Sequence, residues 1–136
     1  MNAKEYLSQV QTLRHLLTCR EGELSYWQGV ANNITASNFE PHYNATRSTS
    51  AAFERAIEKV DEIQRAVDSA IIELVNKCDE INRAIDALSD IQEQTILRYH
   101  YLEDLPLYQA GRRMKISEST VYRIHANALK NLKVPE

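Results

Sequence analysis

The sequence predicts an all-α protein: a long helical hairpin or coiled coil at residues 1–88, then a three-helix domain at 89–136 that ends in a helix-turn-helix. Three observations predict it. The 136 residues include only 3 Gly and 3 Pro, too few for a turn-rich β fold. Apolar residues in the middle of the chain follow a seven-residue repeat. The last third carries helix start and stop signals at short intervals.

Composition argues against several classes of protein. No apolar run approaches the roughly 20 residues that span a bilayer, and the N-terminus MNAKEYLSQV lacks the apolar core of a signal peptide. The two cysteines do not make a disulfide framework, so we expect a reduced, cytoplasmic protein without a membrane partner. His15 and Cys19 are two ligands without a second pair, so no metal or other cofactor is expected. Phosphate-binding glycine loops and nucleophile–base pairs are absent from the sequence, and we do not expect an enzyme.

The central heptad repeat predicts a helix from about Ser50 to Ala87. The a positions are Ile57, Gln64, Ile71, Cys78 and Ile85, and the d positions are Val60, Val67, Leu74, Ile81 and Leu88. Nine of these ten residues are apolar over five heptads, which is typical of coiled-coil packing. Gln64 is expected at the rim of this contact, although a polar a residue can also fix register or partner number.

A second, looser stripe precedes it in the chain. Val10, Leu17, Leu24 and Ala31 alternate with Tyr6, Leu13, Trp27 and Ile34 at helical spacing. The segment SNFEPHYNATRSTS, residues 37–50, has no periodicity and predicts a loop, in which Ser48, Thr49 or Ser50 could cap the next helix. The two helices can fold back on each other, or each can pair with another subunit. The sequence leaves open which of these occurs and whether the loop binds an effector.

Three shorter helices are expected after Leu88. Ser89 and Gln92 have capping-box spacing, which predicts a helix from Ser89 to about Tyr101. The break LEDLP ends in a proline that is tolerated only in the first turn of a helix, so LYQAGRRM forms the next helix and ends near Lys115. Ser117 is then the expected N-cap of a final helix that runs to about Leu132.

The last two of these helices have residue types suited to a helix-turn-helix. Gly111 falls where the crossed helices approach closest, and Ile116 and Val121 are placed to fill the core, with Leu129 and Leu132 continuing the buried stripe. His125 is expected at a solvated position. The opposite face carries Glu118, Ser119, Tyr122 and Arg123, near the helix start that enters the major groove of DNA in such motifs.

Charge is distributed unevenly along the chain. Residues 1–87 hold 9 Lys/Arg against 13 Asp/Glu, a net charge of −4, whereas residues 105–134 hold 6 against 1, a net charge of +5. A chain that is acidic in one part and basic in another suggests that the basic part meets a polyanion. Expected contacts to DNA phosphates are Arg112, Arg113, Lys115, Lys130 and Lys133.

The segment LSDIQEQTILRYHYLEDLPLYQAGRRMKISESTVYRIHANALKNLK resembles region four of bacterial sigma factors, which recognises the promoter −35 element. The matching features run in order from ILRYHYLEDL through Gly111, Met114, Ile116-Ser117 and Ser119-Thr120-Val121 to the trailing ALKNLK, about a third of the chain. By this resemblance Glu118, Ser119, Tyr122 and Arg123 fall at or beside base-contacting positions. Lys115 departs from the pattern, because glycine is common at that turn position and a left-handed lysine costs roughly 1 kcal/mol. Nothing upstream resembles the sigma regions that bind the −10 element.

The whole layout, a coiled N-terminal half opening MNAKEYL and a region-four-like end, resembles phage and prophage proteins related to ArpU/RinA-type late-gene transcription regulators. We therefore expect a sequence-specific regulator of phage transcription that binds double-stranded DNA, with the coil providing a homodimer contact, a contact to RNA polymerase, or both. Two alternatives stay open. One is a protein like the terminase small subunit, which recognises a packaging site, and the other is a module that binds RNA polymerase without binding DNA.

Overall fold

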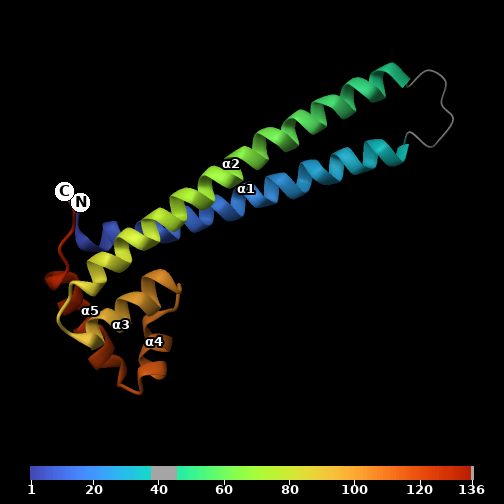
Figure 1. The fold of residues 1–136 in the computed structure, drawn as a ribbon. Helices are drawn as coiled ribbons and strands as arrows, with labels where there is room; N and C mark the ends of the chain where they lie inside the picture. The colour runs from blue at the N-terminus through green and yellow to red at the C-terminus, as the bar shows by residue number, and fades with distance from the viewer. Residues whose placement is uncertain (38–45, 136) are drawn as a thin grey trace. The chain divides into compact units, whose positions relative to one another are not determined.

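The computed structural model describes residues 1–37 and 46–135, and along them the chain is all-α, as predicted. The long helices are α1 (Ala3–Ser37) and α2 (Thr46–Asp86). Short ones follow: α3 (Ile91–Leu97), the π-helical turn η1 (Arg98–Leu102), α4 (Leu107–Met114) and α5 (Glu118–Asn131) (Figure 1). Among these residues no helix is long and apolar enough to cross a membrane.

The chain forms two compact units. Unit 1 comprises Met1–Arg14 and Glu73–Glu136, and unit 2 comprises His15–Ile72. Within each unit a segment of α1 runs antiparallel to a segment of α2 (Figure 1). The predicted 37–50 loop falls mainly on residues 38–45, which lie outside the described residues, as does any effector site there.

Two predicted helix starts were wrong by a few residues. Helix α2 begins at Thr46, so the three positions predicted to precede it, Ser48, Thr49 and Ser50, lie within the helix. Helix α3 begins after Asp90, whose side chain accepts a hydrogen bond of 2.8 Å from the Gln92 backbone N–H. Asp90 therefore takes the capping role that the spacing assigned to Ser89, because a carboxylate two residues before the free N–H groups reaches them equally well.

The core of unit 1 joins the start of α1 and the end of α2 to the C-terminal helices. Its buried residues come from α1 (Tyr6, Leu7, Val10), α2 (Ile81, Ile85), the following turn (Leu88), α3 and η1 (Leu97, Tyr101), and α5 and its end (Ala128, Leu132). Leu132 is buried as predicted, and Leu129 is partly buried against the same core. Unit 1 thus contains residues from both of the regions, 1–88 and 89–136, into which the sequence analysis divided the chain.

The π-helical turn is held by the N-terminal part of α1. A backbone bond of 2.9 Å from the Glu103 N–H to the Arg98 carbonyl closes the wide turn. Gln11 donates to the Asp104 carboxylate at 3.0 Å, and Arg14 donates to the Leu102 carbonyl. Asp104 adopts a left-handed conformation with φ 58°, which aspartate tolerates better than most residues. The turn separates α3 from α4, which packs closely against α5 at Gly111.

In unit 2, the stripe of α2 that contacts α1 differs from the predicted one. Its buried members on α2 are Ala56, Ile63, Val67 and Ala70, three of them one position before the predicted a positions. Ile57 and Ile71 remain 39% and 42% exposed, and Gln64 is exposed as well. The alanines explain the shift, because small side chains let α1 approach and make room for Trp27, which lies with Ile63 and Ala66 around one groove.

Candidate nucleic-acid interface

Helices α4 and α5 cross at Gly111, as the sequence predicted. A Cβ atom added at Gly111 would stand 2.3 Å from Cγ2 of Val121, far inside van der Waals contact. Val121 is completely buried and packs with Ile96 and Ile124, against which Leu107, Met114 and Ile116 also pack. The absence of a side chain at Gly111 therefore sets how closely the two helices lie.

The turn between these helices contains a left-handed residue at Lys115, the conformation that costs a non-glycine residue roughly 1 kcal/mol. Lys115 has φ 59° and ψ 42°, and its N–H bonds back to the Arg112 carbonyl at 3.2 Å. Ile116 N–H bonds to the Gly111 carbonyl at 3.0 Å. Ser117 then caps α5 as predicted, since its hydroxyl accepts from the Thr120 N–H at 3.3 Å. Satisfied backbone groups on both sides define the turn.

One face of α5 is anchored inside unit 1. Val121, Ile124 and Ala128 are buried along it. Near its end, Asn131 donates to both carboxylate oxygens of Glu93 at 3.0 and 3.2 Å, and Glu93 on α3 is only 6% exposed. A buried carboxylate is costly unless it is hydrogen-bonded, so this pair fixes α5 against α3.

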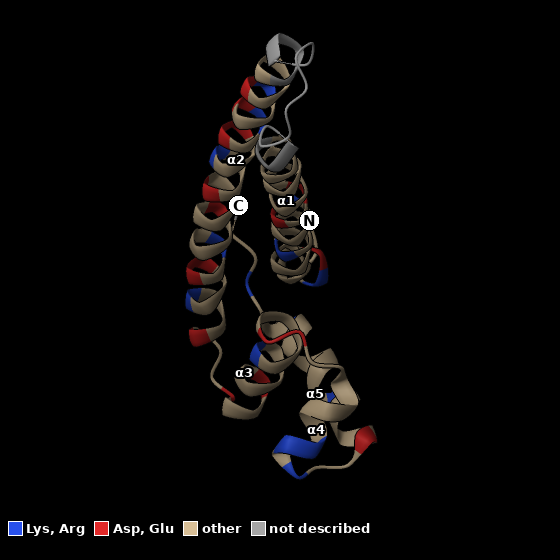
Figure 2. Ribbon diagram, turned by 90° about the vertical axis from the view of Figure 1, so that its right-hand side faces the viewer, with Lys and Arg blue, Asp and Glu red and all other residues tan. Residues whose placement is uncertain are grey.

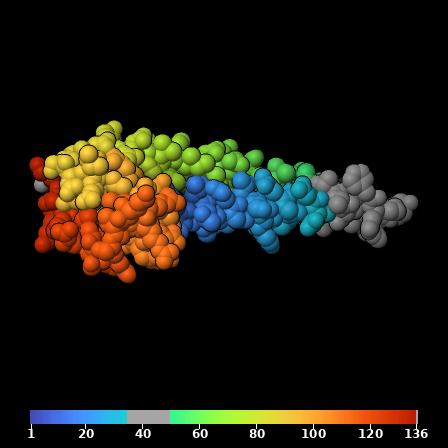
Figure 3. Space-filling view, turned by 90° about the horizontal axis from the view of Figure 1, so that it is seen from below, coloured from blue at the N-terminus to red at the C-terminus, as the bar shows by residue number. Residues whose placement is uncertain are grey.

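The opposite face of α5 is open to solvent. Glu118, Ser119, Tyr122 and Arg123, the four residues predicted to read bases, are all exposed, and Tyr122 is exposed by 51%. They occupy the first two turns of the helix. Figure 3 shows the orange-to-red surface that α4 and α5 contribute to unit 1. This face can approach a broad surface without rearrangement of the core.

Exposed cations accompany this face. The five residues predicted to contact phosphate are all exposed: Arg112, Arg113, Lys115, Lys130 and Lys133. Figure 2 shows the Lys and Arg positions at the end of α4 and in the turn after it. A spread of cations around polar side chains is suited to a polyanionic backbone.

The two arginines of α4 are oriented by aromatic rings. Arg112 lies over Tyr108, with 5.9 Å from the guanidinium carbon to the ring centroid. Arg113 lies over Tyr99 at 5.6 Å and forms a long, exposed ion pair of 3.9 Å with Glu103. Such an exposed pair is weak. Glu103 would therefore compete with any other anion for the Arg113 guanidinium.

Two exposed residues on these helices were missed by the sequence analysis. Asn127 lies one turn beyond Arg123 on α5, and Tyr108 is 48% exposed on α4 beneath Arg112. The signal for Asn127 was its i+4 spacing from Arg123. An asparagine can make two bonds to adenine in the major groove, which makes Asn127 a further candidate.

His125 is not at the solvated position that was expected. Its Nε2 lies 2.9 Å from the Tyr101 hydroxyl, and its ring stacks on Tyr101 with 5.7 Å between centroids. Burial, helped by His100 and Lys4, lowers the pKa of His125 to about 4, and burial raises the pKa of Tyr101 to about 12. His125 is therefore neutral near pH 7 and adds no positive charge to the open face.

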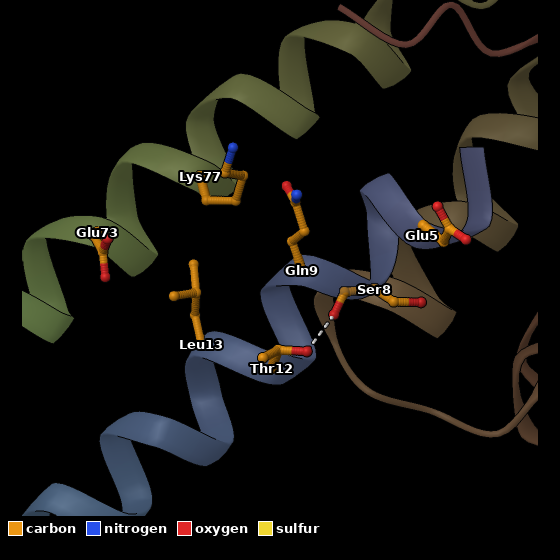
Figure 4. Close-up of a pocket in the computed structure, with 7 residues that line it drawn as sticks. All are labelled: Glu5, Ser8, Gln9, Thr12, Leu13, Glu73 and Lys77. Carbon is orange, nitrogen blue, oxygen red and sulfur yellow. Dashed lines mark hydrogen bonds between the residues drawn. The ribbon is translucent and has the colours of Figure 1, made fainter. Parts of the chain in front are cut away.

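A groove elsewhere in unit 1 offers little chemistry. It has a volume of about 480 Å³ between α1 and α2 (Figure 4). Its lysine, Lys77, is already paired with Glu80 at 2.8 Å and lies over the Tyr6 ring. Within the described part of the chain, the buried Gln9 Oε1 has no hydrogen-bond partner. One unpaired amide oxygen does not make a catalytic or metal-binding arrangement.

The fold and the open face define an all-α protein with a helix-turn-helix ending. By comparison with known families, the chain belongs to the one described as protein of unknown function DUF1492, whose model matches residues 56–133, more than half of the chain. The match includes most of α2 and the complete α4–α5 crossing. Comparison with curated proteins and with solved structures found no match.

Proposed function

We propose that this protein is a sequence-specific DNA-binding regulator of phage or prophage transcription, with α5 in the major groove. One observation carries the proposal. Four polar or aromatic side chains project from the first turns of a helix whose other face is locked by Gly111 and the Glu93–Asn131 pair. A recognition helix needs exposed polar side chains near its start and a second face that is held in place by the rest of the domain.

Each exposed side chain has a chemical role in this proposal. Arg123 can donate two bonds to guanine O6 and N7, which gives base discrimination. Tyr122 can stack on sugar or contact a thymine methyl group, and Ser119 can donate or accept at either base edge. Glu118 can accept from the cytosine amino group, and in the first turn it also interacts favourably with the helix dipole.

The surrounding cations supply affinity without sequence preference. Each phosphate that is neutralised releases a bound counterion, so binding weakens as salt rises. Arg112, Lys115 and Lys130 are exposed. In the proposed complex they contact phosphates of the DNA backbone beside the major groove. The +5 net charge of residues 105–134 favours this association despite the overall charge of −3.

The test is binding of the purified protein to fragments of the phage genome across a salt series. Arg123→Ala should relax discrimination at one base pair, losing about 1–3 kcal/mol on the selected fragment and less on a scrambled one. Arg112→Ala with Arg113→Ala should weaken all fragments alike and reduce the salt slope by about 2. Arg55→Ala with Arg83→Ala, which removes the same charge from α2, is the matched control and should leave the discrimination unchanged.

The outcome also separates the alternatives. A selected fragment beside a promoter supports transcription control. A selected fragment at a packaging site, with a ring of subunits in solution, would support a role like that of the terminase small subunit. Binding to RNA polymerase with no measurable DNA affinity would contradict the proposal and favour the polymerase module.

A further inference from the structure

The first turns of α1, dark blue in Figure 1, belong to unit 1 together with the C-terminal helices. Leu7 is buried in the same core as Ala128 and Leu132, which lie on α5 and at its end. These turns are outside residues 56–133, the part of the chain that matches the family model. Residues 1–14 are nevertheless part of the compact unit that carries the open face of α5.

One flank of this part of α1 faces the C-terminal helices at two levels. At the first level, Gln11 donates to the His100 carbonyl at 3.4 Å and to the Asp104 carboxylate at 3.0 Å. Lys4 is seven residues earlier, so it lies on the same flank, about 10 Å closer to the start of the helix. Burial, then His100 and then the positive charge of Lys4 lower the pKa of His125 to about 4. The Lys4 ammonium group therefore lies near the His125 ring of α5.

The Lys4 ammonium group is free to bind an external anion. Lys4 is exposed, and among the residues that the structure describes it has no ion-pair partner. Its neighbour Glu5 points away from it around the helix, and the Glu5 carboxylate accepts from the Asn2 N–H at 3.3 Å. Asp104 and Glu118, the acids on the flanks that meet here, are each about two helical turns from this level.

The flank of α5 beside Lys4 has no cation of its own. Its residues follow the spacing of one helical stripe: Glu118, Tyr122, His125 and Leu129. His125 is neutral near pH 7, because its pKa is about 4. A helix of about 10–12 Å diameter fills a major groove about 12 Å wide, so a phosphate backbone runs along each of its flanks. A phosphate beside this stripe therefore needs a cation from another element.

We propose that Lys4 binds a DNA phosphate on this side of α5, so that the start of α1 forms part of the surface that contacts DNA. This inference rests on the proposed function and extends it to a segment outside the helix-turn-helix. A lysine ammonium group is a compact point charge that donates to phosphate oxygens. Phosphate contacts carry no sequence information directly, so Lys4 adds affinity and leaves base discrimination to α5.

Fluorescence anisotropy of the full chain with a labelled selected duplex and a scrambled duplex, over a salt series, tests the contact. Lys4→Gln should weaken binding to the selected duplex by about 5-fold at physiological salt, because one phosphate contact and its counterion release are lost. The slope of log affinity against log salt should fall by about 1 on both duplexes. Lys4→Arg keeps the charge and should retain most of the affinity.

Two controls separate a contact from an effect of net charge. Lys59→Gln makes the same change at an exposed lysine of unit 2 and should leave both affinities and both slopes unchanged. Glu5→Gln removes a negative charge beside Lys4 and should leave the salt slope unchanged, because Glu5 is not in the contact. If Glu5→Gln raised the affinity and the slope as much as Lys4→Gln lowered them, Lys4 would act only through net charge, and the contact would be refuted.

The position of Lys4 is tested without DNA by an NMR titration of the His125 ring. Lys4→Gln should raise the pKa of His125 above that of the wild type, because a charge that disfavours the imidazolium is removed. An unchanged His125 pKa would overturn the inference. A wild type that binds DNA no better than Lys4→Gln, with the same salt slope, would also overturn it and leave the proposed function standing. A wild type that binds neither duplex would overturn both.

Discussion

The crossing of α4 and α5 in unit 1 depends on the absence of a side chain at Gly111, which makes Gly111→Ala an informative perturbation. In an open helix this change stabilises by about 1 kcal/mol, because alanine loses less backbone entropy on folding. Here the new Cβ would lie 2.3 Å from Cγ2 of Val121. Val121 is completely buried, so its methyl group has no free space to rotate into.

The expected net effect follows from these two opposing contributions. Overpacking a well-packed core costs about 1–3 kcal/mol, and the propensity gain offsets about 1 kcal/mol. We expect Gly111→Ala to lower the free energy of unfolding by up to about 2 kcal/mol, instead of raising it as in an open helix. Val121→Ala alone should cost about 2 kcal/mol for two buried carbons. The double variant should be less destabilised than the sum, because truncating Val121 makes room for the new methyl group.

Urea denaturation followed by far-UV circular dichroism measures these free energies, with a constant denaturant slope as the check on comparability. Gly22→Ala and Gly29→Ala are matched controls, since both glycines lie within α1 and a Cβ there would meet nothing within 4 Å. They should stabilise by up to about 1 kcal/mol. If Gly111→Ala stabilised as they do, with additive effects at Val121, the close crossing of α4 and α5 would be refuted.

Three further predictions concern the same unit. Lys115→Gly should stabilise the fold by about 1 kcal/mol in urea denaturation, because Lys115 is held at φ 59° and glycine adopts that conformation without strain; an unchanged midpoint would contradict the left-handed turn. Asn131→Ala should destabilise by about 2 kcal/mol, because it leaves the buried Glu93 carboxylate without its donor, and Lys130→Ala, at an exposed neighbouring position, should change stability little. The pKa of His125 is about 4 in the fold against an ordinary 6.5, so its contribution to stability is complete above pH 6.5 and is lost as pH falls toward 4. The loss at pH 5 is at most about 2 kcal/mol and about 1 kcal/mol after allowing for partial exposure, and thermal denaturation of His125→Gln should show a flatter pH profile over that window.

The C-terminal helices could be predicted from the sequence because their signals are local. Pro106 lies at the N-cap of α4, Ser117 caps α5, and Gly111 marks the crossing, each through chemistry within a few residues. The outward direction of Tyr122 and Arg123 followed from the helical period once Val121 was assigned to the core.

The features that were missed depend on distant partners. The π-helical turn at Arg98–Leu102 is held by Gln11 and Arg14, almost ninety residues away in the chain. His125 is partly buried because Tyr101 lies against it, which no periodicity in α5 could reveal.

The helix seam of α2 was misassigned for a similar reason. Ile57 and Ile71 fit a heptad better than the alanines that precede them, and only the approach of α1 shows that Ala56 and Ala70 form the inner contact. The residue type shows how apolar a position is, but which side of α2 is buried depends on where α1 packs.

The central claim is that the outer face of α5 binds DNA, and mapping amide chemical shifts during titration with a selected duplex tests it most directly. We predict saturable changes concentrated at residues 117–130 and at Arg112 and Lys115, with the amides of unit 2 unaffected. These changes should disappear with a scrambled duplex at physiological salt. Shifts confined to residues 15–72, or no saturable change with any duplex, would contradict the account.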